Sequence, residues 1–179
     1  CSGTAIPFFR DHSNYFLPCR YHLATQPGFW WDGNALGVPA YADPQYQFWH
    51  PPALLFRLLP FAAAYNAALL LGFAVMFVFT FLLGRHCHDG TTGLFCAVAL
   101  TGSGTILSLS EFPSYFVTFA ALFPLAYVVT TAARSPYRLY WVPPLLYCAL
   151  TAGGLSFFFL ALPALLAAIP HLRRQGIRS

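Results

Sequence analysis

The chain has 179 residues, of which 58% are hydrophobic and only 8% are charged. In a soluble domain about a quarter of the residues are charged. A chain with so few charged residues cannot form the charged surface of a soluble globular domain, so this class of protein is excluded. All fixed positive charge comes from arginine, because the chain contains no lysine. The arginines stand at the ends of apolar stretches, a pattern that indicates membrane orientation and argues against a nucleic-acid partner.

Residues 1–60 are the polar part of the chain. Pro, Gly, Asn and Gln are too frequent there for a spanning helix. The segment predicts a long loop with short helices, and Tyr15 to Leu23 predicts a brief amphipathic helix at the membrane interface, where aromatic rings concentrate.

Three apolar stretches follow the loop. Residues 61–84 are uncharged, and at about 1.5 Å per residue they can cross roughly 30 Å of hydrocarbon. Residues 91–109 are rich in Gly, Ser, Thr and Ala, which let helix backbones approach closely, so they predict a helix inside the bundle. Residues 112–133 predict a third span.

The last apolar stretch is too long for one span and is interrupted at Gly153-Gly154. It therefore predicts two short spans, residues 139–152 and 154–171, before a cytoplasmic tail of residues 173–179. The expected fold is an all-α integral membrane protein with about five transmembrane helices after an extracytoplasmic loop. We expect a fragment of a longer protein, because the chain starts at Cys1 and not at methionine.

Arginine placement sets the expected orientation. By the positive-inside rule, six arginines lie on the cytoplasmic side, namely Arg85, Arg134, Arg138, Arg173, Arg174 and Arg178. The polar loop then lies outside the membrane, and so does Glu111 in the turn between the second and third spans. This topology gathers four of the five acids on the outer face, namely Asp11, Asp32, Asp43 and Glu111.

Asp11 and Asp43 are the candidate catalytic or metal-binding residues on that face. A carboxylate partly desolvated by lipid and aromatic rings can act as a general base toward a hydroxyl. The same carboxylates can hold a divalent cation that neutralises a phosphate leaving group. The alternative is a structural role, in which these acids cap helices or pair with a nearby arginine.

A resemblance gives these residues a context. The order of short motifs resembles the first external loop of bacterial YfhO-type membrane proteins, within the GT-C glycosyltransferase superfamily. The motifs are Asp11…Pro18, Trp30-Trp31, Gly37-x-Pro39, Ala42-Asp43-x-Gln45 and Pro51-Pro52 before an apolar helix. The resemblance implies a protein of the bacterial cytoplasmic membrane, with membrane lipids and a polyprenyl-phosphate-linked sugar as partners.

The same resemblance implies sugar transfer to a cell-envelope acceptor at the outer face of the membrane. Asp11 occupies the place of the family's catalytic carboxylate, and Asp43 is a second candidate. Arg20 or Arg57 would hold the donor phosphate, since a guanidinium suits phosphate geometry. The other expected substrate-binding residues are Gln45, His50, Glu111, Trp30 and Trp31. The tryptophans either stack on sugar rings or form an interfacial belt.

Two alternatives come from a different class of protein. The chain can be a noncatalytic membrane scaffold, or a transporter subunit with polar groups near the middle of the membrane. Asn66 and the small residues of 91–109 are the features that favour transport. Motifs for nucleotide binding or for a serine nucleophile are absent from the sequence.

Overall fold

A computed structural model describes residues 16–26, 28–33, 37–43, 46–132 and 135–154, together with Phe159 and Pro170. This part of the chain is mostly helical, with seven α-helices and one two-stranded sheet. The predicted span 154–171 and the predicted tail 173–179 lie outside the described residues, apart from Phe159 and Pro170.

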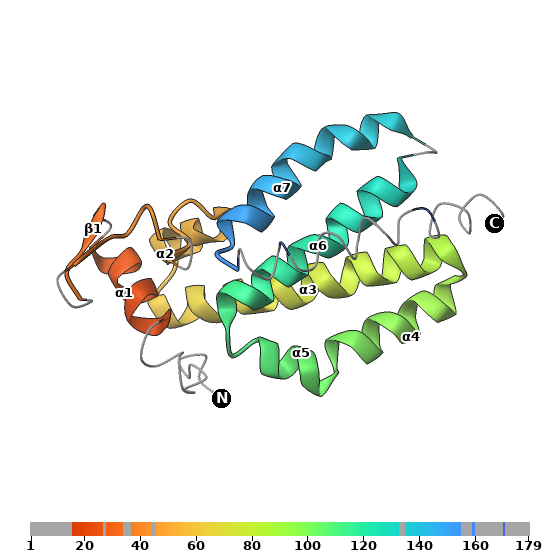
Figure 1. Cartoon of the computed structure of the whole chain (residues 1–179). Coiled ribbons are helices and arrows are strands. Elements are labelled where there is room, and N and C mark those ends of the chain that lie inside the picture. The colour runs from red at the N-terminus through yellow and green to blue at the C-terminus, as the bar shows by residue number, and fades with distance from the viewer. Residues whose placement is uncertain are drawn as a thin grey trace.

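The polar loop folds into a small module of its own at one end of the molecule (Figure 1). Its elements are α1 (Leu17–Thr25), β1 (Trp30–Trp31), β2 (Val38–Pro39), η3 (Pro51–Leu54) and α2 (Leu55–Leu58). The strands pair antiparallel, with Trp30 opposite Pro39. Aromatic and aliphatic side chains fill the centre of this module, namely Cys19, Leu23, Trp31, Ala40, Tyr46 and Phe56. The loop thus has a hydrophobic core that holds its side chains in place.

The apolar stretches form a row of antiparallel helices (Figure 1). These are α3 (Phe61–Cys87), α4 (Gly90–Thr101), α5 (Gly104–Leu109), α6 (Pro113–Thr131), the 3-10 helix η4 (Pro136–Trp141) and α7 (Val142–Thr151). In this row α3 packs against both α4 and α6, and α6 packs against α7. Among the described residues α4 packs against α3 and lies at the edge of the row, whereas its small residues predicted an interior position.

The second apolar stretch differs from its prediction in a further way. The expected helix 91–109 is two helices, because the chain breaks at Gly102 and restarts at Ser103. The Ser103 hydroxyl accepts a hydrogen bond from the Ile106 amide at 3.3 Å, which caps the N-terminus of α5. The turn expected at Gly153-Gly154 is present after α7, where Gly153 has a φ of 90°.

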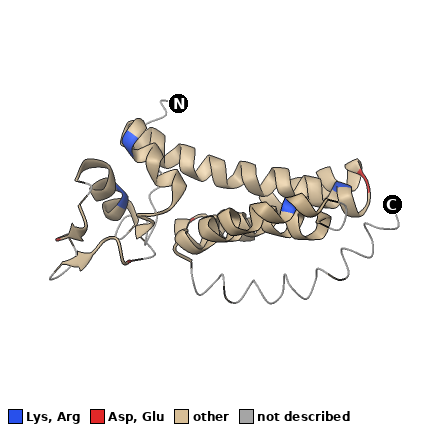
Figure 2. Ribbon diagram, turned by 90° about the horizontal axis from the view of Figure 1, so that it is seen from above, with Lys and Arg blue, Asp and Glu red and all other residues tan. Residues whose placement is uncertain are grey.

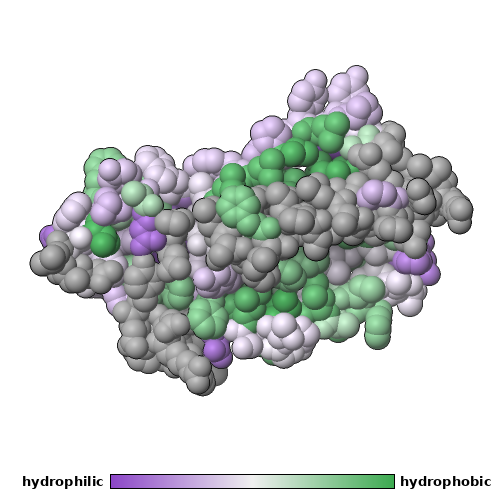
Figure 3. Space-filling view, viewed as in Figure 1, coloured by the Kyte–Doolittle hydropathy of each residue, from purple (hydrophilic) through white to green (hydrophobic). Residues whose placement is uncertain are grey.

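The antiparallel order gives the molecule two distinct ends. Arg85 and Arg138 lie at the end far from the loop, whereas Arg20 and Arg57 lie in the loop module (Figure 2). In the view of Figure 3, the coloured atoms in the middle of the molecule are mostly hydrophobic, and the most hydrophilic ones lie near the two ends. By length and composition α3 and α6 are each apolar enough to cross a membrane.

Candidate functional site

Arg20 of α1 anchors the loop module from the inside. Its side chain is 3% exposed and donates from Nη1 to the Tyr46 carbonyl at 2.6 Å and from Nη2 to the Gln47 amide oxygen. The guanidinium also lies 5.9 Å from the centre of the Phe56 ring. Burying a cation is costly unless its donors are satisfied, and these contacts offset that cost. Arg20 therefore holds the chain segment that contains Tyr46 and Gln47.

Gln47 connects Arg20 to the helices. Its amide nitrogen donates to the Ala152 carbonyl at the end of α7, while its amide oxygen accepts from Arg20. Gln47 has a φ of 57°, a left-handed conformation that costs on the order of 1 kcal/mol for a residue other than glycine. The strained backbone and the bridging side chain fix the loop against the C-terminal end of α7.

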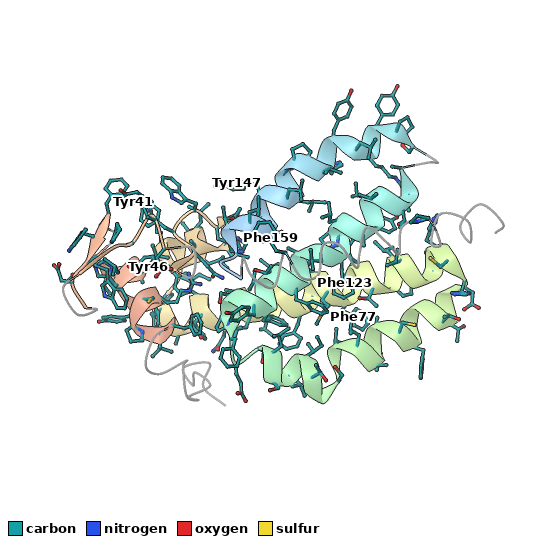
Figure 4. The ribbon with its side chains drawn as sticks, in the orientation of Figure 1. Tyr41, Tyr46, Phe77, Phe123, Tyr147 and Phe159 are labelled. Atoms are coloured by element: carbon teal, nitrogen blue, oxygen red, sulfur yellow. The ribbon has the colours of Figure 1, made fainter. Side chains whose placement is uncertain are left out.

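Trp49 is held at the same junction. The hydroxyl of Tyr147, from α7, donates to the Trp49 carbonyl at 2.8 Å, and the Trp49 indole nitrogen donates to the Tyr41 carbonyl at 3.1 Å. Figure 4 shows Tyr147 where α7 meets the loop. The indole is half exposed, at 54%, so it has a fixed backbone and a ring face available to a ligand.

His50 is the most unusual polar group of the junction. Its side chain is 5% exposed, and its Nδ1 lies 3.4 Å from the Thr151 hydroxyl oxygen. That hydroxyl donates its own proton to the Tyr147 carbonyl at 2.8 Å, so Nδ1 is the donor toward Thr151. In a neutral ring Nε2 is then an acceptor, and it has no hydrogen-bond partner within the described part of the chain.

The pKa of His50 explains why the neutral ring is the stable form. Burial, together with the nearby Arg20 charge, lowers the pKa of His50 to about 3, although a hydrogen bond to the Cys148 carbonyl raises it slightly. His50 is uncharged at neutral pH and presents a lone pair at Nε2.

Acid should destabilise the fold through this residue. Between pH 6.5 and about 3 the unfolded His50 binds a proton and the folded one does not, so stability falls as the pH falls. We expect the free energy of unfolding at pH 4.5 to be about 2.5 kcal/mol lower than at pH 7 on account of His50. Thermal unfolding of the wild type and of His50→Asn at both pH values measures this difference. A pH dependence that is equal in both proteins would contradict it.

Two open pockets lie next to Trp49. The first lies between the loop, α2 and α7, spans ≈ 750 Å³ with open solvent included, and its lining includes His50, Arg57 and Tyr147. The second spans ≈ 420 Å³ with open solvent included, and its lining includes Tyr41, Asp43 and Thr151. Trp49 lines both of them. One pocket therefore has an arginine in its lining and the other an aspartate, and Trp49 is common to both.

An apolar groove begins beneath these pockets. It lies between α3, α6 and α7 and spans ≈ 570 Å³ with open solvent included. Aliphatic side chains and proline rings form most of its wall, and His50 and Cys148 supply its only polar side-chain atoms among the lining residues. His50 thus lines both the groove and the pocket that contains Arg57.

Some of the predicted site residues line the pockets at the junction, and others do not. His50 and Arg57 line one of the two pockets next to Trp49, and Asp43 lines the other. Trp30 is exposed on β1, whereas Trp31 is buried against the rings of Tyr46 and His22. Glu111 lies in the turn after α5 and lines none of the pockets described above. Asp11 and Gln45 lie outside the described residues.

Sequence reasoning did not single out the α7 side of the junction. The geometry of the junction depends equally on Tyr147 and Thr151 of α7 and on Gln47, the loop residue that bonds to the end of α7. About a hundred positions separate the two sides in sequence, and no local motif links them.

The described residues contain no group of three or more His, Cys, Asp or Glu side chains that could hold a metal ion. Asp11 is not among them, so a cation held by Asp11 and Asp43 stays a prediction. Comparison with known proteins finds no matching family model, no similar curated protein and no similar solved structure.

Proposed function

We propose that this chain is a membrane-embedded, glycosyltransferase-like protein that transfers a sugar from a polyprenyl-phosphate donor to a cell-envelope acceptor. The junction of the loop with α7 is the proposed site, at the outer face of the membrane. One observation carries the proposal: the pocket lined by Arg57 and the pocket lined by Asp43 share Trp49 as a lining residue. A sugar phosphate needs a cation for the phosphate and a polar, aromatic surface for the sugar.

Membrane insertion of the helices is supported by what they expose. In the most apolar 18-residue window of α3 only 17% of the residues are buried. Its outward face and that of α4 carry large apolar side chains, such as Leu70 at 67% exposure and Phe95 at 72%. Such a surface is unfavourable in water and favourable in lipid.

Arg57 is the cation proposed to hold the phosphate. It is exposed at the end of α2 and lines the larger pocket next to Trp49. The guanidinium of Arg20 already donates to Tyr46 and Gln47, so its geometry favours a role in holding the loop.

The acid and the aromatic rings complete the proposed site. Asp43 or Asp11 takes the proton from the acceptor hydroxyl as the new glycosidic bond forms. The phosphate leaves with the negative charge, which Arg57 stabilises. The Trp49 ring provides a face on which a sugar can stack.

Sugar transfer by the purified full-length protein in lipid nanodiscs tests this function. Arg57→Gln should lower kcat/KM about tenfold, through loss of one charge-assisted contact to phosphate. Arg57→Lys should retain part of it, because the positive charge remains. Of Asp11→Asn and Asp43→Asn, the variant that removes the base should lose transfer.

The noncatalytic alternative makes the opposite prediction. A noncatalytic scaffold would show no sugar transfer in the wild type or in any of these variants. Unchanged transfer in Asp11→Asn, in Asp43→Asn and in the double variant would refute the proposed chemistry.

A further inference from the structure

His50 Nε2 is a buried hydrogen-bond acceptor without a partner in the described chain. Leaving such an atom unsatisfied costs about 1–3 kcal/mol. Native structures rarely keep this cost unless water or a ligand satisfies the atom. The ring is otherwise well fixed, because its Nδ1 faces the Thr151 hydroxyl.

The direction of Nε2 follows from ring geometry. The two nitrogens of an imidazole point to divergent sides, so a ring whose Nδ1 faces α7 has its Nε2 facing away from α7. On that side a small cavity of ≈ 20 Å³, about the room that one hydroxyl group or water molecule needs, is formed by the loop, α3 and α6, and its lining includes no residue of α7. The same pocket shares Pro52, Ala68 and Val117 with the apolar groove.

We propose that the apolar groove binds the hydrocarbon chain of a lipid whose free hydroxyl donates a hydrogen bond to His50 Nε2. The groove supplies the apolar surface, and the histidine supplies one oriented acceptor at its head. A neutral imidazole lone pair favours an O–H donor and disfavours a carboxylate, which has only lone pairs to offer. The ligand is therefore a lipid alcohol, and an anionic fatty acid is disfavoured.

This inference names a substrate class for the proposed transfer and in that respect rests on it. A hydroxyl-bearing lipid at His50 lies beside the pocket that contains Arg57 and Trp49, because His50 lines both. The lipid would serve as the acceptor, while the donor phosphate binds Arg57. Binding itself needs no sugar donor, so it can be measured separately from transfer.

Binding of radiolabelled hexadecanol and of its methyl ether to the full chain in nanodiscs provides the test. The ether retains the oxygen and the hydrocarbon chain but lacks the O–H donor. We expect the wild type to bind the alcohol about five- to tenfold tighter than the ether, as one buried hydrogen bond predicts. The ratio of the two affinities is the readout, because it does not depend on the fraction of folded protein.

Three variants distinguish the contribution of the hydrogen bond to affinity from the contribution of the apolar groove. In His50→Asn the amide nitrogen can replace Nδ1 toward Thr151 but nothing replaces Nε2, so the ratio should fall to about one. His50→Gln should restore part of the ratio, because its longer amide can present an acceptor near the Nε2 position. Leu145→Ala shortens the apolar wall and should weaken the alcohol and the ether by the same factor.

Three results would overturn the proposal. The first is equal binding of alcohol and ether by the wild type, and the second is an unchanged ratio in His50→Asn. The third is no binding of either compound, which would leave Nε2 to a buried water. If the alcohol binds as expected but sugar transfer is absent, the lipid site stands and the transferase proposal fails.

Discussion

Arg20→Met should destabilise the loop module by about 3 kcal/mol. Methionine keeps most of the apolar stem of the side chain but removes the guanidinium. The Tyr46 carbonyl and the Gln47 amide oxygen then lose their charged donor in a buried setting. A hydrogen bond to a charged group contributes about 1.5–3 kcal/mol, and buried acceptors left unpaired add to the loss. Unfolding monitored by tryptophan fluorescence measures the effect, since Trp31 lies in the core of this module.

Arg57→Met is the matched control for that experiment. Arg57 belongs to the same module but is exposed, so its replacement should change stability by less than about 0.5 kcal/mol. The Arg20 variant should also become sensitive to protease within the loop, because Gln47 no longer has its partner on α1. Equal stability of the two variants would mean that the Arg20 contacts do not hold the loop.

The apolar helices are the part of the fold that the sequence predicts best. Away from water, backbone N–H and C=O groups must form hydrogen bonds within the chain. A run of about two dozen uncharged residues therefore predicts a helix. The structure accordingly has α3 over Phe61–Cys87 and α6 over Pro113–Thr131, near the predicted 61–84 and 112–133. The break at Gly102 was not predicted, because small residues favour close helix packing and helix ends alike.

The candidate site was predictable only in part. Arg57 and Asp43 stood out as charges in an apolar chain, and the structure brings them to neighbouring pockets. The role of Arg20 was not predictable, because sequence cannot distinguish a buried arginine from an exposed one. The orientation of His50 depends on Thr151, which is 101 positions away, and such a pair leaves no local signal.

The close contact of α3 with α4 depends on two glycines. An added Cβ at Gly93 would lie 2.6 Å from the Phe81 carbonyl oxygen and 2.9 Å from the Arg85 nitrogen. An added Cβ at Gly84 would lie 2.7 Å from the Gly93 Cα atom. These are contacts with backbone, which cannot rotate away as a side chain can. Small residues therefore set the distance between these helices.

Gly93→Ala should consequently separate the two helices and cost about 2–3 kcal/mol, the upper range for overpacking a well-packed contact. Gly90→Ala is the control on the same helix, because an added Cβ there meets nothing within 4 Å. It should be neutral or slightly stabilising, since alanine favours helix more than glycine does. The midpoint of thermal unfolding in micelles measures both variants.

Gly72→Ala gives an intermediate case that tests the reason for this ranking. Its added Cβ would lie 2.6 Å from the Phe116 ring, and the ring belongs to a side chain that can shift. We expect its cost to fall between those of Gly93→Ala and Gly90→Ala. If Gly72→Ala proves the most destabilising of the three, rigid side-chain packing around Phe116 limits the bundle more than the backbone contact of α3 with α4.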